Sequence, residues 1–334
     1  MPEQSRAGRA PRGGAPRVTM LVSVVFLLVA LAAVASALFG GWGAWSGIAG
    51  STGAQWQIRP LWLASAVASG GAALWISGAI WGAMFRASGG RSGIREAAAM
   101  WLGSNLGRYL PGKIWQVTGL VGFVRARGDS GAGALATLLV FQALMLASGA
   151  GIAVAALGAG AFEGVGAWPV VLGGLGVAAA LTPPVLRLVV RLGGRLLREP
   201  GEIEEVPLRG SLLIRAAAGS LLVWLLHGFG FWALLEGLVA DNPVGPVVAC
   251  GVFSASYVIG YLAVIAPGGI VVREGAMASL LGVVSTISLG PAAALALAAR
   301  LWTTVAELAA FGVGLALARW VGGRSEPQRE RGSL

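Results

Sequence analysis

The stretch GALATLLVFQALMLASGAGIAVAALGA, from Gly133 to Ala159, holds 27 residues without a charged side chain. A helix needs about 20 consecutive apolar residues to cross the hydrocarbon core of a bilayer, so this stretch is long enough to span one. The whole chain shares this character, because 56% of its 334 residues are hydrophobic and only 11% are charged. Ordinary soluble domains carry about 25% charged residues. The composition therefore predicts an all-α polytopic membrane protein and excludes a soluble one.

Other apolar runs of similar length flank this stretch on both sides. They are Val18–Phe39, Pro60–Phe85, Trp168–Val190, Leu212–Val239 and Ala292–Ala318. The first run exceeds the ~7–15 residues of the hydrophobic region in a signal peptide, so we interpret it as a span and not as a cleaved signal. The run from Trp168 contains a Pro183-Pro184 break, through which we expect it to cross.

Two pairs of apolar segments are interrupted by proline and glycine. In the first pair, Glu96–Leu110 and Ile114–Val124 flank Pro111-Gly112. The longer arm measures about 23 Å as a helix, short of the ~30 Å hydrocarbon core. Arginines stand at both outer ends: Arg95, Arg125 and Arg127. We therefore expect a re-entrant hairpin that enters from the cytoplasm, and the alternative is one kinked span.

In the second pair, Val247–Ala266 and Ile270–Leu289 flank Pro267-Gly268-Gly269. These arms are long enough to cross fully, so two complete spans are an alternative to a hairpin here. The order of two spans, a broken pair and one span occurs over residues 18–160 and again over 168–318. Because the second copy starts from the opposite face, the two halves are predicted to be inverted, as in many transporters.

The predicted architecture is about six full spans plus two re-entrant hairpins, or up to eight spans. They form a single integral membrane domain at 18–320 between basic cytoplasmic tails at 1–17 and 321–334. Of 24 Lys and Arg residues, Arg59 falls outside and four fall at membrane depth, which leaves 19 on the proposed cytoplasmic face. This asymmetry predicts that both termini are cytoplasmic. Spread along the chain, these charges do not indicate a nucleic-acid partner, which requires a basic patch on one folded face.

The four cations at membrane depth lie beside the two Pro-Gly breaks and in the last span. A buried cation costs at least ~2.5–3.5 kcal/mol on insertion scales, and helix N-termini, such as those after each break, bind anions. We therefore predict a midplane pocket for a phosphate-bearing lipid head group, in which cations hold the phosphate and Glu274 and Glu307 orient them or relay protons. The predicted substrate-binding residues are Arg108, Pro111, Gly112, Lys113, Pro267, Gly268, Gly269, Arg273, Glu274, Arg300 and Glu307.

A structural network is the alternative for these charges, with Arg273 and Glu274 paired to each other or to Arg300 and Glu307. For His227 we favour a structural role. The single Cys250 and the single histidine exclude a disulfide, a cysteine zinc cluster and any mechanism that needs two histidines. No metal, no cofactor and no catalytic residue is predicted.

Three motifs resemble a known family. Asn105–Gln116 (NLGRYLPGKIWQ) resembles the first motif in the transmembrane region of lysyl-phosphatidylglycerol synthases and related flippase-like proteins. Ala266–Ala276 (APGGIVVREGA) resembles their Pro-Gly-Gly-x-Gly-x-Arg-Glu motif, with Val271 in place of the usual glycine. Ala299–Trp302, with Glu307 after it, is similar to the Arg-bearing last helix.

The resemblance covers nearly the whole chain and implies a bacterial inner-membrane protein that handles or flips lipids. Full-length members also carry a soluble aminoacyl-transferase domain, which this sequence lacks, so synthesis of lysyl-phosphatidylglycerol is not implied. The leading hypothesis is a flippase-like transporter, not an enzyme, for an anionic phospholipid or a polyprenyl-phosphate-linked lipid. ATP is not its own energy source, because the sequence has no Gly-x-x-x-x-Gly-Lys-Ser/Thr motif.

Two alternatives come from other functional classes. One is a non-catalytic partner subunit of a synthase or glycosyltransferase complex. The other is a membrane glycosyl or aminoacyl transferase component. The transferase is the weaker of the two, because its chemistry calls for an acidic residue near the first outer loop, and Gly40–Arg59 contains none.

Overall fold

The computed structural model describes residues 56–105, 107, 114–160, 168–180, 182–197, 209–263 and 271–322. The expected span Val18–Phe39, the tail 1–17 and residues 323–334 of the other tail lie outside the described residues. Within the described part every element is a helix and no strand is present, so the all-α prediction is confirmed there.

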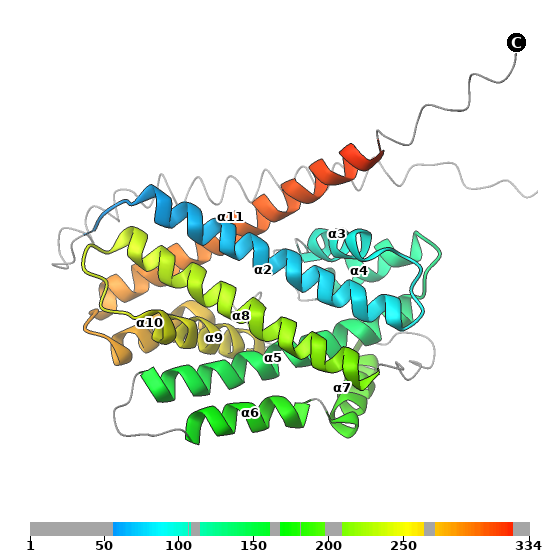
Figure 1. Cartoon of the computed structure of the whole chain (residues 1–334), viewed down its shortest axis with the longest axis horizontal. Coiled ribbons are helices and arrows are strands. Elements are labelled where there is room, and N and C mark those ends of the chain that lie inside the picture. Colours follow the sequence, from blue (N-terminus) through cyan, green and yellow to red (C-terminus); the bar gives the residue numbers. More distant parts are fainter. Residues whose placement is uncertain are drawn as a thin grey trace, which may run out of the picture. The chain divides into compact units, whose positions relative to one another are not determined.

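Four long helices form the frame of the described bundle (Figure 1): α2 (Pro60–Ala87), α5 (Gly131–Gly160), α8 (Gly210–Leu238) and α11 (Leu289–Gly322). Each contains a stretch long and apolar enough to cross a membrane, which gives four candidate spans in the described part. Their bounds lie within four residues of the predicted apolar runs. In lipid, an uninterrupted apolar run satisfies its backbone hydrogen bonds only as a helix.

A fifth candidate span is bent. α6 (Trp168–Ala180) and α7 (Pro183–Leu197) meet at the Pro183-Pro184 break, and their axes differ by 64°. The described residues therefore hold four candidate spans, or five if this bent pair counts as one, against the six to eight predicted for the whole chain.

The first broken pair forms α3 (Ile94–Asn105) and α4 (Ile114–Arg125), which pack against each other. Their outer ends are tied together, since Glu96 at the start of α3 forms an ion pair with Arg127 just beyond α4. With 12 residues each, the arms are about 18 Å long. The two arms therefore run antiparallel as a short hairpin, which one kinked span would not do.

Asp129 adds a second tie between the ends of this hairpin. Its carboxylate accepts hydrogen bonds from the backbone N–H of Arg91 at 3.0 Å and from the N–H and hydroxyl of Ser92 at 3.3 and 3.0 Å. Burial by itself would raise the pKa of Asp129, but these hydrogen bonds and the charge of Arg91 outweigh it. The pKa of Asp129 therefore lies below its ordinary value of 3.8.

The second broken pair forms α9 (Pro246–Leu262) and α10 (Val272–Val284), which are also in contact. α10 has 13 residues, or about 20 Å, and it ends at Ser285 in a short turn that leads into α11. The predicted second arm, Ile270–Leu289, is thus too long. At 13 residues, α10 as described is shorter than the ~20 residues that a span of the hydrocarbon core needs, so its length favours a hairpin over two complete spans.

The pattern of which helices touch is the same when the two halves exchange places, although the extent of the contacts differs between the halves. Under the exchange of α2, α3, α4 and α5 with α8, α9, α10 and α11, every substantial contact among these eight helices maps onto another one. The pairs are α2–α3 with α8–α9, α3–α4 with α9–α10, α4–α5 with α10–α11, α5–α8 with α11–α2, α5–α9 with α11–α3, and α2–α5 with α8–α11.

The α2–α8 pair maps onto itself and lies at the centre of this arrangement (Figure 1). The two helices are antiparallel, because the N–H groups of Gln57 and Arg59, before α2, donate to the carbonyls of Leu238 and Gly237 at the end of α8, each at 3.0 Å. The exchange therefore inverts the direction of these helices, as an inverted repeat requires.

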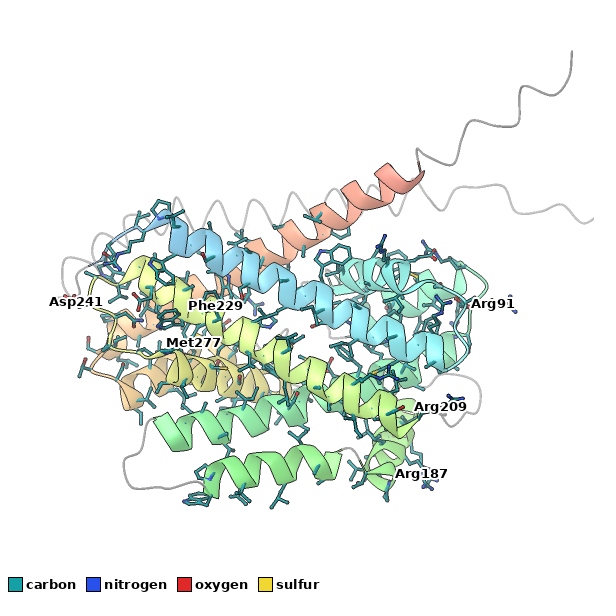
Figure 2. All side chains as sticks on the ribbon, in the orientation of Figure 1. Arg91, Arg187, Arg209, Phe229, Asp241 and Met277 are labelled. Carbon is teal, nitrogen blue, oxygen red and sulfur yellow. The ribbon has the colours of Figure 1, made fainter. Side chains whose placement is uncertain are left out.

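Arginines collect at one end of the helix bundle. Figure 2 shows Arg91, Arg187 and Arg209 at this end and Asp241 at the opposite end. We call the first the arginine end. It contains the tied ends of the α3–α4 hairpin and the start of α8.

Candidate functional site: a buried arginine in a polar chamber

Two adjoining cavities lie among the helices of both halves. They share five lining residues, and all five have polar side chains: Gln116, Gln142, Tyr257, Tyr261 and Arg273. We call the joined cavities the chamber. Each of the eight helices of the exchange set contributes at least one lining residue, whereas α6 and α7 contribute none.

The first turns of two symmetry-related helices face this chamber. Gln116 is the third residue of α4, and Arg273 is the second residue of α10. These helices follow the two Pro-Gly breaks and exchange with each other in the packing pattern. Helix N-termini carry unpaired N–H donors and a partial positive charge, so both first turns favour an anion in the chamber.

Arg273 is held against α9 by ring stacking. Its Cζ atom lies 5.0 Å from the ring centroid of Phe253 and 5.1 Å from that of Tyr257. α10 can approach so closely because α9 has Gly260 at the contact, where a Cβ atom would lie 2.6 Å from the Cβ of Arg273. The distances from the Cζ of Arg273 to the two ring centroids are within the ~6 Å range of cation–π attraction.

The guanidinium of Arg273 is nevertheless not fully satisfied. Arg273 is only 9% exposed, and its Nη2 atom donates no hydrogen bond to any described residue. It also forms no ion pair with the described carboxylates. A buried charge is expensive unless it is paired and hydrogen-bonded, so this unused donor, in a side chain that lines both cavities, points to an anionic ligand.

Glu274 is engaged by two other groups. Its Oε1 atom lies 3.6 Å from Nη1 of Arg300 on α11, and its Oε2 atom accepts a 2.7 Å hydrogen bond from the N–H of Val271. The structural alternative is therefore correct for the Glu274–Arg300 pair, which links α10 to α11. Arg273 has no described carboxylate within ion-pair distance, although Glu274 and Glu307 lie close enough to interact with its charge.

Glu307 and Arg300 also reach the chamber from α11. Glu307 is 8% exposed and lines the same cavity as Arg273, while Arg300 lines the adjoining one. His227 lines the chamber too, although its Nδ1 lies 3.0 Å from the carbonyl of Val223 in its own helix and its ring stacks on Phe253. These contacts agree with the structural role predicted for His227, but its position gives it access to a ligand.

Of the eleven predicted site residues, Arg273, Arg300 and Glu307 line the chamber, and Glu274 is joined to it through its ion pair with Arg300. The other seven lie outside the described residues: Arg108, Pro111, Gly112, Lys113, Pro267, Gly268 and Gly269. Lys113 directly precedes α4 in the sequence, whose first turn faces the chamber.

Four chamber residues were not predicted from the sequence: Gln116, Gln142, Tyr257 and Tyr261. The sequence contained a signal for Gln142, because it is the only residue with a side-chain amide in the 27-residue run Gly133–Ala159. Gln116 lies in the quoted first motif, where its amide nitrogen donates to the side-chain oxygen of Asn105. The tyrosines are spaced by one helical turn, which places both on one face of α9.

Taken together, the described residues form a helical bundle in which several helices are long and apolar enough to span a membrane, as in a multi-pass membrane protein. A buried polar chamber that contains charged residues lies between the two sets of helices that exchange in the packing pattern. In the part of the chain that the structure describes, no group of three His, Cys, Asp or Glu side chains could hold a metal ion. No family model matches the chain, and no curated protein or solved structure matches it.

Proposed function

We propose that this protein is a flippase-like transporter that passes an anionic lipid head group through the chamber. The substrate is an anionic phospholipid or a polyprenyl-phosphate-linked lipid of a bacterial inner membrane. The observation that carries the proposal is the buried Arg273, whose side chain lines both cavities of the chamber and whose Nη2 has no hydrogen-bond acceptor among the described residues. A phosphate oxygen is the acceptor that a guanidinium prefers.

The residues of the chamber divide the binding task. Arg273 supplies the charge, and the amides of Gln116 and Gln142 together with the phenol groups of Tyr257 and Tyr261 supply neutral donors. Arg300 lines the adjoining cavity and offers a second cation, which Glu274 holds in place. Glu307 would orient the cations or carry a proton as the head group passes.

The short hairpins support a transport path and not only a binding site. α3, α4 and α10 are each too short to cross the hydrocarbon core, so we infer that both broken pairs are re-entrant and bring helix starts to membrane depth. Because the halves are inverted, the hairpins enter from opposite faces. This arrangement is the one in which alternating access takes place around a midplane site.

The arginine end would face the cytoplasm, as the positive-inside rule predicts. A head group would then leave one leaflet beside one hairpin and enter the other leaflet beside the second. No nucleotide-binding motif is present in the sequence, so the movement would be downhill or coupled to an ion.

The test is lipid scrambling by the purified protein in liposomes. The liposomes contain trace phosphatidylglycerol with a fluorescent acyl-chain label, and a membrane-impermeant reductant bleaches the outer-leaflet label. Wild-type protein should allow more than half of the label to be bleached, and Arg273→Ala should restore the half-bleached limit of protein-free liposomes. The matched control is Arg215→Ala, an exposed arginine on α8 that does not line the chamber.

Two outcomes would contradict parts of the proposal. If Arg273→Ala scrambles as fast as the wild type, the chamber is not the lipid path. If the wild type scrambles neither labelled phosphatidylglycerol nor a labelled polyprenyl phosphate, the transport proposal is wrong. The partner-subunit alternative then becomes the better explanation.

A further inference from the structure

The helix α7 separates its polar and apolar residues more strongly than any other described helix. Its arginines, Arg187, Arg191 and Arg195, are spaced by four residues. Residues at this spacing lie along one side of a helix, so Arg187 and Arg191 form a stripe on one side of α7, the arginine stripe. Both Arg187 and Arg191 are exposed.

The apolar residues of α7 face two different surroundings. Leu186 is buried, and α7 packs against α5. Leu188 and Leu192, in contrast, are 54% and 48% exposed, and Val185 beside them is 39% exposed. Helical geometry puts this exposed apolar stripe between the buried side and the arginine stripe.

The direction of α7 also differs from that of the helix before it. α6 follows α5 closely, since a Cβ on Gly151 would lie 2.8 Å from the carbonyl oxygen of Gly173. After the Pro183-Pro184 break α7 turns by 64°, which Figure 1 shows as a change from along the bundle to across it. Figure 2 shows Arg187 at the arginine end, with Arg91 and Arg209.

We propose that α7 is an interfacial helix whose arginine stripe binds the head groups of anionic lipids at the arginine end. The exposed stripe of Leu188 and Leu192 would lie in the acyl-chain boundary beneath the head groups. A helix with an apolar stripe beside a cationic stripe fits a lipid–water interface, because only there does it meet hydrocarbon on one side and anionic groups on the other. This surface is separate from the chamber, to which α7 contributes no lining residue.

The first test measures the depth of α7 in the full-length protein. Single cysteines replace Leu188, Leu192, Arg187 and Arg191 in a Cys250→Ser background, and spin labels on them report depth through the relaxation effects of oxygen and a water-soluble nickel complex. The vesicles contain phosphatidylglycerol and phosphatidylcholine. Labels at 188 and 192 should lie at equal depth just below the phosphates, with labels at 187 and 191 nearer to water.

A spanning orientation of α7 would give a different depth profile. Positions 188 and 192 would then differ by up to about 6 Å along the membrane normal, and depth would change steadily along the helix. That result would overturn the proposal. It would leave the transport assay untouched, because the two experiments probe different residues.

The second test measures lipid selectivity. Full-length protein carrying Arg187→Gln, Arg191→Gln and Arg195→Gln is compared with the wild type for phosphatidylglycerol retained over phosphatidylcholine after detergent washing. We expect the triple variant to lose several-fold of this preference, whereas the matched control Arg209→Gln with Arg215→Gln keeps it. Equal preference in the triple variant and the wild type would overturn the proposal. If the triple variant does not fold, the depth profile still decides the question.

Discussion

Val271 holds a backbone conformation that a valine should avoid. Its φ is +73° and its ψ is −47°, and it is the only described non-glycine residue with a positive φ. These angles lie near the γ-turn conformation at about +75° and −65°, which is rare and strained. The side chain is 76% exposed, so few protein contacts depend on it. The motif that this stretch resembles has glycine at this position, and glycine adopts positive φ without steric cost.

We therefore expect Val271→Gly to stabilise the protein. Strain of this kind costs about 1–3 kcal/mol, which glycine would relieve. Glycine also makes the unfolded chain more flexible, and this entropy lowers the stability by about 0.5–1 kcal/mol. The net gain is on the order of 1 kcal/mol in the free energy of unfolding. The hydrogen bond from the N–H of residue 271 to Glu274 is a backbone interaction and should remain.

The matched control is Val283→Gly in the same helix. Val283 is 72% exposed but sits within α10 with ordinary helical geometry, so glycine there should destabilise by roughly 0.5 kcal/mol. The assay is unfolding in mixed micelles of dodecyl maltoside and SDS, followed by far-UV circular dichroism. The two variants should shift the midpoint in opposite directions. If Val271→Gly unfolds at a lower SDS fraction than the wild type, the strain argument is refuted.

Two further predictions concern other contacts. Gly260→Ala should destabilise the protein by about 1–3 kcal/mol and reduce scrambling. The new Cβ would lie 2.6 Å from the Cβ of Arg273 and 3.2 Å from the Cα of Arg273, which cannot move unless α10 moves. Unchanged unfolding and transport would show that α9 and α10 pack differently. Asp129→Ala should remove a stabilisation that the wild type has in full above the ordinary carboxyl pKa of 3.8 and loses as the pH falls through the lowered folded-state pKa. The difference in stability between the two proteins, measured by SDS unfolding, should therefore shrink below pH 3.8. A difference that widened there would contradict the prediction.

The long helices were predictable from the sequence because their signal is local. An uninterrupted apolar run can only be helical in lipid, and the runs at Pro60 and Gly133 became α2 and α5 with small changes of boundary. The bend before α7 was harder. Hydropathy averages over a window, so it did not distinguish a kinked span from an apolar helix followed by an amphipathic one, although the spacing of Arg187 and Arg191 carried that information.

The site was predictable only in its charged members. A charge such as Arg273 stands out in an apolar segment, because its burial requires a reason. Neutral polar residues such as Gln116 and Tyr257 do not stand out, since the interior faces of membrane helices often contain them. They become a site only when the fold brings α4 and α9 to the same cavity, and the sequence does not specify that proximity. The pairing of Glu274 with Arg300, in preference to Arg273, depends in the same way on how α10 meets α11.

The stacking of Arg273 argues for a ligand more strongly than its burial does. Two desolvated cation–π contacts contribute about 2 kcal/mol each, which offsets much of the several kcal/mol needed to bury a guanidinium. They satisfy its faces, however, and leave an edge donor such as Nη2 unused. A hydrogen bond from a charged donor contributes about 1.5–3 kcal/mol, a factor of roughly 10 to 150 in affinity. A reversible anion site needs a guanidinium that is held by rings and keeps an unused donor. A carboxylate partner in the protein would have to be displaced each time an anion bound.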